Sequence, residues 1–555
     1  MAHRGGAVHV VTTRRRYKGR VYATHLLRRS YREDGRVKNE TLGNLSHLPE
    51  SLIDIVRRSL RGETFVPLAA RLEVLGSRPH GHVLAVRTAM QRLGIESLLG
   101  AQACAERERI CALIAARVLA PHTKLATTRW WHTSTLAEEF GVTDADEDDL
   151  YAAMDWLLER QSVIERKLAA RHLGEGALAL YELSSSYFEG TRCPLGTIGY
   201  SRDRQKHKLQ VNFGLLTTRK GCPISVSAYE GNAADAKTLM PQVAMLKDSF
   251  GLEHVVLVGA HGMISHKAIG EIKTIEGMAW ITALKSSQIR VLVEAGALQL
   301  GLFDERNLFE LTHPAYPGER LIPCRNPELA QIRERAARGA LHGEAAIGLK
   351  LERVLDKYKV GKNFALTLTA SQVGQVAAEV ALDGIYVIRT ALPKKQMSAP
   401  EAVRSYKALA QVERAFRSLN TVEFKIRPTH HRLENRVRAH ILLCMLAYYV
   451  EWHLIEAWRS RLFADEDQAA KTSRDPVAPA KRPAAALEKA HSHLSTEGTP
   501  VHSLRTLIAE LATLVRNTCR TPGTLEHPAT FDILTTPTAL QRRAFELLNS
   551  ITVAV

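Results

Sequence analysis

The sequence predicts an α/β protein built around one mixed β-sheet, with a small basic β segment and a helical domain ahead of that sheet. Two observations support this prediction. Three runs of β-prone residues, separated by Gly- and Pro-marked turns, follow one another at 177–188, 208–217 and 223–230. Helical patterns then alternate with two short, continuously apolar runs at 254–259 and 279–284, which is typical of buried parallel strands.

The order of these elements is three strands, a helix at 236–250, a strand, a helix at 265–274 and a further strand. Three antiparallel strands that lead into alternating helices and strands form an RNase H-like core, although a fold alone does not establish a function. Residues 286–400 mix short strands with a charged helix at 328–338 and are expected to form a β-rich insertion, after which a helix resumes near Ala399.

The charge of the chain favours a nucleic acid as its partner. Its 75 Lys and Arg exceed its 58 Asp and Glu by 17, and such a positive potential attracts phosphates. Residues 1–45 hold eleven of the cations and only three acids, a net of +8. Arg14, Arg15, Arg16 and Lys18 gather at a predicted hairpin turn, Lys18-Gly19. A solvated edge that deters strand aggregation is the alternative, but this density favours contact with the DNA backbone.

A chain of 555 residues is too long for one hydrophobic core, which rarely exceeds about 250–300 residues. Apolar residues recur at helical spacing through 51–175, and 464–490 has the Ala, Pro and Lys content of a linker. The expected parts are a basic β-rich DNA-binding segment at 1–50, a helical domain at 51–175 that is also expected to bind DNA, an RNase H-like core at 176–285 and 401–460, an insertion domain at 286–400, a linker at 464–490 and a helical tail at 491–555.

The seven cysteines form no C-x-x-C pair, and their odd number is a poor basis for a disulfide framework, so a reducing cytoplasm is expected. The longest apolar run, Ile441–Val450, is about half of a membrane span. We therefore expect a cytoplasmic protein without membrane association.

Five sequence blocks resemble the DDE transposases of bacterial insertion sequences. The blocks are Y-E-L-S-S-S-Y-F-E-G at 181–190, G-Y-S-R-D at 199–203, Y-E-G-N-A-A-D at 229–235, V-V-L-V-G-A-H-G-M at 255–263 and S-Y-K-A-L-A-Q-V-E-R-A-F-R-S-L at 405–419. They occur in the family's order over most of the chain. The resemblance implies double-stranded DNA as the partner, both terminal inverted repeats and target DNA, and a homodimer or higher assembly that bridges two DNA ends. It also implies a bacterial protein associated with the nucleoid.

The same resemblance implies a two-metal site in which three carboxylates hold two Mg²⁺ or Mn²⁺ ions about 3.5–4 Å apart for phosphoryl transfer. Matched motif by motif, the first Asp falls on Glu182, the second on Ala260 and the Glu on Glu413. Glu182 and Glu413 are thus the implied catalytic and metal-binding residues. The extra methylene of Glu182 displaces its carboxylate, and Ala260 offers no ligand, so metal binding and catalysis are expected to be impaired.

The block around Glu413 also departs from the family pattern, because Leu409 and Asn420 stand where cations are usual. Residues 403–440 nevertheless hold nine cations and three acids, a net of +6 that suits DNA. The DNA-contacting residues expected here are Tyr406, Lys407, Arg414, Arg417, Asn420, Arg427 and Arg432.

Three other residues near these blocks have alternative roles. His261 adjoins the lost position, but imidazole is a poorer Mg²⁺ ligand than oxygen. Asp235 is expected to cap the helix that follows it, and Asp203 to pair with a neighbouring arginine. Without the family blocks, Glu413 itself would be interpreted as a surface ion-pair member beside Arg414.

The sequence leaves three candidate functions open. The first is an active transposase that cleaves at terminal repeats and joins 3′-hydroxyls to target DNA. The second is a transposase-derived DNA-binding protein or regulator that has lost its chemistry, and Ala260 favours it. The third is another RNase H-like nuclease, which the long insertion and the Tyr406-to-Glu413 signature oppose.

Overall fold

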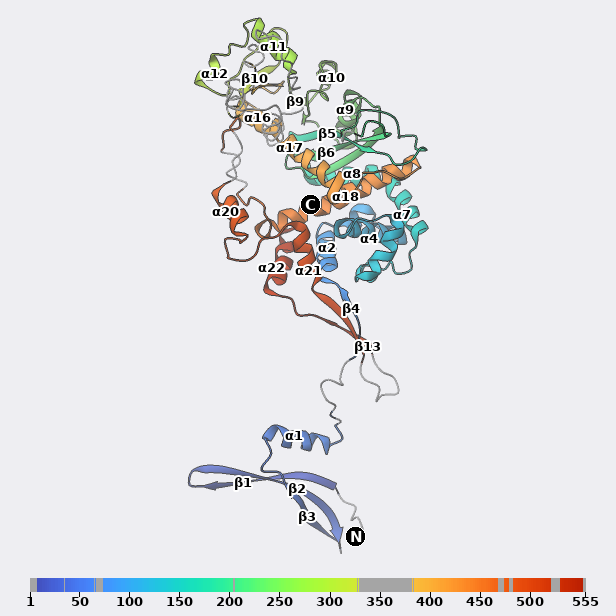
Figure 1. Ribbon diagram of the computed structural model, residues 1–555, viewed down its shortest axis with the longest axis vertical. Helices are drawn as coiled ribbons and strands as arrows, with labels where there is room; N and C mark the ends of the chain where they lie inside the picture. Colours follow the sequence, from blue (N-terminus) through green and yellow to red (C-terminus); the bar gives the residue numbers. More distant parts are fainter. Residues whose placement is uncertain are drawn as a thin grey trace. The chain divides into compact units, whose positions relative to one another are not determined.

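A computed structural model describes residues 7–33, 35–63, 65, 73–202, 205–326, 328, 382, 384–467, 474–478, 483–520 and 530–552. The chain divides into two compact units (Figure 1). The N-terminal unit comprises Met1–Ser77 with Asn517–Ile533, and the core unit comprises Arg78–Arg516 with Leu534–Val555.

The N-terminal unit begins with a three-stranded antiparallel meander of β1 (Ala7–Tyr17), β2 (Arg20–Glu33) and β3 (Arg36–Asn44). Lys18 and Gly19 form the β1–β2 turn with φ of 49° and 79°, the left-handed conformation that two-residue hairpins require. The predicted hairpin at Lys18-Gly19 is therefore confirmed. Helix α1 (Glu50–Ser59) follows, and its Arg57 donates hydrogen bonds to Thr12 and His25 on the meander.

A second three-stranded sheet joins segments from the two ends of the chain. Its order is β13 (Thr530–Leu534), β12 (Val515–Arg520) and β4 (Glu73–Pro79). Arg520 forms an ion pair with Glu73 at 2.5 Å. This sheet differs from the sequence prediction, which had helical structure around 73–79 and a helical tail after 491. Pairing partners more than 400 residues apart leave no periodic signal in either local segment.

The core unit opens with the predicted helical region. Its helices are α2 (Gly81–Arg92), α3 (Ile95–Leu99), α4 (Ala105–Leu119), α5 (Lys124–Trp130), α6 (Leu136–Glu139), α7 (Glu147–Glu159) and α8 (Gln161–His172). Their apolar faces meet in one buried cluster with residues of the sheet. The acidic run before α7 starts that helix, because Asp146 and Asp149 form a reciprocal capping box.

A seven-stranded mixed sheet forms the centre of the core unit, in the order β10-β11-β9-β8-β5-β6-β7. Its strands are β5 (Ala177–Tyr187), β6 (Gln210–Thr218), β7 (Pro223–Glu230), β8 (Val255–Val258), β9 (Met278–Ala283), β10 (Arg320–Arg325) and β11 (Ile385–Thr390). Strands β5, β6 and β7 are antiparallel neighbours, and β8 and β9 run parallel to β5. This strand order and direction is that of an RNase H-like core, as predicted.

The insertion contributes to this sheet and carries a core of its own. Strand β11 pairs antiparallel with β9, and β10 extends the sheet at its edge. A second hydrophobic cluster gathers residues of α11 (Ser286–Glu294), α12 (Leu302–Glu305) and these two strands. The buried guanidinium of Arg389 pairs with Glu319 through two hydrogen bonds of 2.6 and 2.8 Å. Apart from Glu328, the predicted charged helix at 328–338 lies outside the described residues.

The helices that follow the insertion pack against the sheet (Figure 1). They are α16 (Ala399–Lys407), α17 (Leu409–Arg417), the π-helical turn η6 (Ser418–Val422) and α18 (Glu434–Ala457). Helix α18 contacts α2, α4 and α7 as well as β7, so it lies between the helical region and the sheet. No helix in the described part of the chain is long and apolar enough to cross a membrane.

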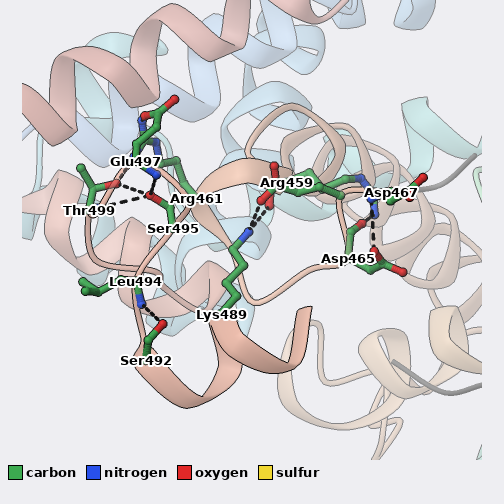
Figure 2. A network of polar contacts seen from close by, with 11 residues as sticks. Arg459, Arg461, Asp465, Asp467, Lys489, Ser492, Leu494, Ser495, Glu497 and Thr499 are labelled. Atoms are coloured by element: carbon green, nitrogen blue, oxygen red, sulfur yellow. Dashed lines mark hydrogen bonds and ion pairs between the residues drawn. The ribbon is translucent and has the colours of Figure 1, made fainter. Parts of the chain in front are cut away.

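Part of the predicted linker is packed rather than extended (Figure 2). Helix α20 (Ala484–Ser492) begins within it, and the buried Lys489 donates to Glu466 at 2.7 Å and to the carbonyl of Arg459 at 3.2 Å. Arg461 reaches Glu497 at 2.5 Å. Helices α21 (Leu504–Ala512) and α22 (Ala539–Leu547) follow. The Ala- and Pro-rich composition did not indicate the ion pair between Lys489 and Glu466 inside this segment, or the bond from Lys489 to Arg459 outside it.

The buried carboxyl group of Glu165 connects the helical region to the sheet, and we expect it to make the stability of the fold depend on pH. Glu165 of α8 accepts hydrogen bonds from Val226 N at 3.0 Å and Gln161 Nε2 at 2.9 Å. Burial raises its pKa from 4.5 to about 7 despite these bonds. The folded state therefore holds this proton more tightly than the unfolded state, so its contribution to stability falls as pH rises from 4.5 to about 7.

Glu165→Gln keeps an acceptor at this position and removes the titration. We expect it to stabilise the chain at pH 8 by up to about 3 kcal/mol and to have little effect near pH 4. Urea unfolding at both pH values measures the difference, with the exposed Glu159→Gln as the matched control. An equal effect of Glu165→Gln at both pH values would contradict this assignment.

Candidate active site and nucleic-acid interface

Glu182 lies at the middle of β5, the strand that pairs antiparallel with β6 and parallel with β8, and the residue is only 4% exposed. Side chains alternate between the two faces of a strand, so Glu182, Ser184 and Ser186 share one face. Phe213 of β6 pairs directly with Ser184 and lies on the same face. This polar line on an otherwise apolar strand is the first part of the candidate site.

Ala260 lies two residues beyond the end of β8. Strand β8 runs parallel to β5, with Leu180 paired to Val258. Ala260 and Glu182 each lie two residues beyond this last parallel pair, Ala260 past the end of β8 and Glu182 within β5. The Ala260 carbonyl accepts hydrogen bonds from Met263 and Ile264, so a tight turn begins here. The side chain that reaches the site from β8 is therefore a methyl group.

Glu413 belongs to α17, which contacts β5 and β6. Phe416 packs edge-on against Phe213, with ring centroids 5.5 Å apart, and the Asn420 amide donates to Ser184 Oγ at 3.1 Å. Helix α17 and its π-helical extension thus cover the face of β5 that carries Glu182. Glu413 is half-buried on this helix. The structure therefore brings the elements that carry Glu182, Ala260 and Glu413 to one region of the sheet.

The bond between Ser184 and Asn420 predicts a coupled effect on stability. Both side chains are buried, at 6% and 5% exposure. Ser184→Ala leaves the Asn420 amide unpaired and should destabilise the chain by about 1–3 kcal/mol. Adding Asn420→Leu should recover part of that loss, because no donor then lacks its acceptor. Urea unfolding of the single and double variants gives the coupling, and strictly additive effects would refute it.

Sequence reasoning missed the hydroxyl network behind the candidate site. Thr429 Oγ1 donates to Ser186 Oγ at 3.1 Å, and Ser186 Oγ donates to the Ile426 carbonyl at 3.2 Å. Arg427 donates to the Ser185 carbonyl at 2.6 Å. The segment after η6 therefore runs beside the end of β5 and is held there. The three consecutive serines on a core strand were the available signal, because buried hydroxyls require partners.

Two family blocks meet beside this network. Arg202 forms an ion pair with Asp235 at 2.7 Å, and its backbone N–H donates to Ser185 Oγ at 3.2 Å. The prediction that Asp235 caps a helix is wrong: η3 (Asp235–Thr238) has no side-chain cap, and the carboxylate binds Arg202 instead. A Cβ on Gly199 would lie 1.9 Å from the Gly231 carbonyl oxygen, so these two loops require glycine at this position. Asp203 lies outside the described residues.

The cations predicted to bind DNA at the N-terminus are all exposed. Arg14, Arg15 and Arg16 lie on β1, and Lys18 lies in the hairpin turn. Successive residues of β1 point to opposite faces, so the arginines line both sides of the hairpin tip. Tyr17 and Tyr22, also exposed, lie among them. The tip is thus a protruding surface of positive charge and aromatic rings.

The second basic cluster, the DNA contacts predicted within residues 403–440, contains both exposed and partly or fully buried side chains. Arg414, Arg417 and Arg432 are exposed, and Tyr406 is half-buried. Lys407 donates to the Pro476 carbonyl, and burial lowers the pKa of its amine. The Asn420 and Arg427 side chains take part in the contacts described above. The exposed arginines are therefore the members of this cluster that a DNA backbone can reach without rearrangement.

The donor set at this site does not fit the three-carboxylate, two-metal arrangement. Within the described ranges, the one group of three or more His, Cys, Asp or Glu side chains placed to hold a metal ion is His172, Cys222 and His453, which includes neither Glu182 nor Glu413. His261 is half-buried and does not complete a metal-binding group there. DDE transposases generally depend on a divalent metal ion, and Glu182 and Glu413 alone supply too few anionic oxygens for two such ions.

Two transposase family models match the sequence. A transposase DDE domain matches residues 190–450, a range that includes Ala260 and Glu413, and the N-terminal domain of IS1634 family transposases matches residues 10–65. No curated protein matches the sequence significantly.

Among solved structures, a similar chain is that of the "Cryo-EM structure of piggyBac transposase synaptic complex with hairpin DNA", with a TM-score of 0.35 and 9% identity over 80% of this chain and 86% of that chain. The resemblance is too weak to carry an argument. The two family matches, in the order expected from the sequence and on an RNase H-like core, identify this chain as a member of the DDE-type transposases of insertion sequences.

Proposed function

We propose that this chain is a transposase that binds the terminal inverted repeats of its element and whose DNA cleavage and strand transfer are impaired. The observation that carries the proposal is Ala260 directly after β8: it and Glu182 of the parallel neighbour β5 each lie two residues beyond the pair Leu180–Val258. A methyl group at this position removes one anionic ligand from a site that needs three. Glu182 adds a second departure, because its carboxylate extends one bond farther than that of Asp.

The proposed partner is double-stranded DNA, both terminal repeats and target DNA. The exposed cations of the β1–β2 hairpin and the exposed arginines of the second cluster support this proposal, because phosphate neutralisation supplies most of the affinity of such proteins. The candidate DNA contacts are Arg14, Arg15, Arg16, Lys18, Tyr406, Arg414, Arg417 and Arg432. We propose a dimer or higher assembly on DNA, since two element ends must be joined in one complex.

The residues proposed to hold a divalent cation, Mg²⁺ or Mn²⁺, are Glu182 and Glu413. When bound in a complete site, such ions stabilise the charge that develops on the phosphate. With two carboxylates and an alanine, we expect binding to be weak. No step of the reaction is therefore assigned to a metal in the unaltered chain.

A second function, a DNA-binding regulator without chemistry, is favoured by the same alanine. The impaired transposase and the regulator differ only in whether any DNA cleavage remains.

Competition binding tests the property that both functions share, specific binding of the terminal repeats. The purified chain is mixed with labelled duplex carrying the repeats that flank its gene, and with a scrambled duplex of equal length. We expect tighter retention of the repeats. Equal retention of both duplexes would contradict specific end binding under either function.

A further inference from the structure

Three potential metal ligands meet outside the carboxylate site. They are His172, the last residue of α8, Cys222, directly before β7, and His453, in α18. One ligand atom from each lies within 4.8 Å of the others. These residues come from three elements that are far apart in the sequence, so the packing of the core unit has brought them together.

The position of Cys222 is set by a tight turn. Thr218 N donates to the Cys222 carbonyl at 2.9 Å, and Cys222 N donates to Thr218 Oγ1 at 3.2 Å. Gly221 adopts a φ of +86°, and a Cβ there would lie 2.8 Å from Gln411 Cβ. The turn therefore directs the thiol inward, where the side chain is 1% exposed and forms no disulfide.

The two histidines are held beside each other by aromatic neighbours. Their ring centroids are 5.7 Å apart, and the His453 ring packs against Tyr449 at 4.7 Å and Trp452 at 4.8 Å. His172 Nε2 is hydrogen-bonded to the Tyr449 hydroxyl at 2.9 Å, which orients the ring as an outer-shell partner orients a metal-binding histidine.

The Nε2 atom of His453 is buried and has no hydrogen-bond partner among the described residues. A buried ring nitrogen of this kind is unfavourable unless a ligand satisfies it. Burial also lowers the pKa of His172 to about 4 and that of His453 to about 3, so both rings are neutral near pH 7. Neutral imidazole is the form that ligates metal ions.

We propose that His172, Cys222 and His453 bind one Zn²⁺ ion and so connect α8, the β6–β7 turn and α18. A thiolate with two imidazoles selects zinc over magnesium, and three protein ligands leave the fourth position to water. Burial raises the pKa of the Cys222 thiol, and the bound ion supplies the charge that removes its proton. The ion stabilises the junction between the helical region and the sheet, separately from the carboxylate site.

The test uses the full chain, stripped of metal by a chelator, without DNA. Adding Zn²⁺ should give one bound ion per chain by elemental analysis and raise the melting temperature. Cys222→Ser and His453→Gln should each weaken binding by at least about tenfold. Cys193→Ser, which alters another buried free cysteine, should bind like the unaltered chain. Binding that survives Cys222→Ser unchanged would overturn the proposal.

A cobalt spectrum keeps the test decisive if a variant fails to fold. Co²⁺ added to the unaltered chain should give a near-ultraviolet thiolate-to-cobalt band and the intense visible bands of a tetrahedral site. Circular dichroism checks the fold of each variant. An unaltered, folded chain that shows no thiolate band and binds no stoichiometric Zn²⁺ would show that the cluster is a metal-free part of the core.

Discussion

Replacing both Glu182 and Ala260 by Asp is expected to raise Mg²⁺-dependent nicking of terminal-repeat DNA by on the order of 10²–10³-fold over the unaltered chain. Positions 182 and 260 each lie two residues beyond the last parallel pair of β5 and β8, and the helix that carries Glu413, α17, packs against β5. Three anionic side chains then surround the proposed metal position. Single-turnover nicking of a labelled repeat measures the gain.

Two controls separate a restored site from a general effect of the substitutions. Ala260→Asn in combination with Glu182→Asp has the same size and no second charge, so it should stay near the unaltered rate. Glu413→Gln added to the double Asp variant should remove the gain. DNA retention should be equal in all of them. A double Asp variant that folds, binds the repeat and still does not cleave would exclude Ala260 as the cause of the impairment.

The second large effect concerns DNA retention. Changing Arg14, Arg15, Arg16 and Lys18 to Gln together should weaken retention of the repeat by about 10²-fold near physiological salt. The physical reason is counterion release: each lost phosphate contact lowers the slope of log affinity against log salt by about 0.9. Titrations of unaltered and variant chains at several salt concentrations measure both quantities.

The matched control removes four exposed cations from elsewhere in the chain. Lys267, Lys394, Lys395 and Arg543 are exposed and belong to neither basic cluster. Their change to Gln lowers the net charge equally and should leave most of the salt slope intact. If the control weakens retention as much as the hairpin variant, net charge rather than the hairpin accounts for DNA binding.

The strands of the core could be predicted because each carries its own local pattern. The run at 223–230 is β7 residue for residue, and the short apolar run at 254–259 contains β8. Buried parallel strands are continuously apolar, and antiparallel ones are marked by turns at both ends. The order of such strands along the chain was sufficient to identify the RNase H-like topology.

Contacts between distant segments could not be predicted in this way. Strands β4 and β12 become a sheet only by pairing across more than 400 residues. The bond from Asn420 to Ser184 buries a residue that the sequence interpreted as a DNA contact, because helix spacing does not tell which face meets the strand. The cluster of His172, Cys222 and His453 has no ligand spacing at all in the sequence.

Cleavage by the unaltered chain is the most direct test of the central claim that this transposase binds DNA ends with an incomplete carboxylate site. The measurement is single-turnover nicking of an end-labelled terminal repeat at protein concentrations that retain all of the duplex, with Mg²⁺ and, separately, Mn²⁺. The account predicts full retention and a nicking rate at least about 10²-fold below that of the chain with Asp at 182 and 260. Equal nicking rates of the two chains at the repeat end would contradict it.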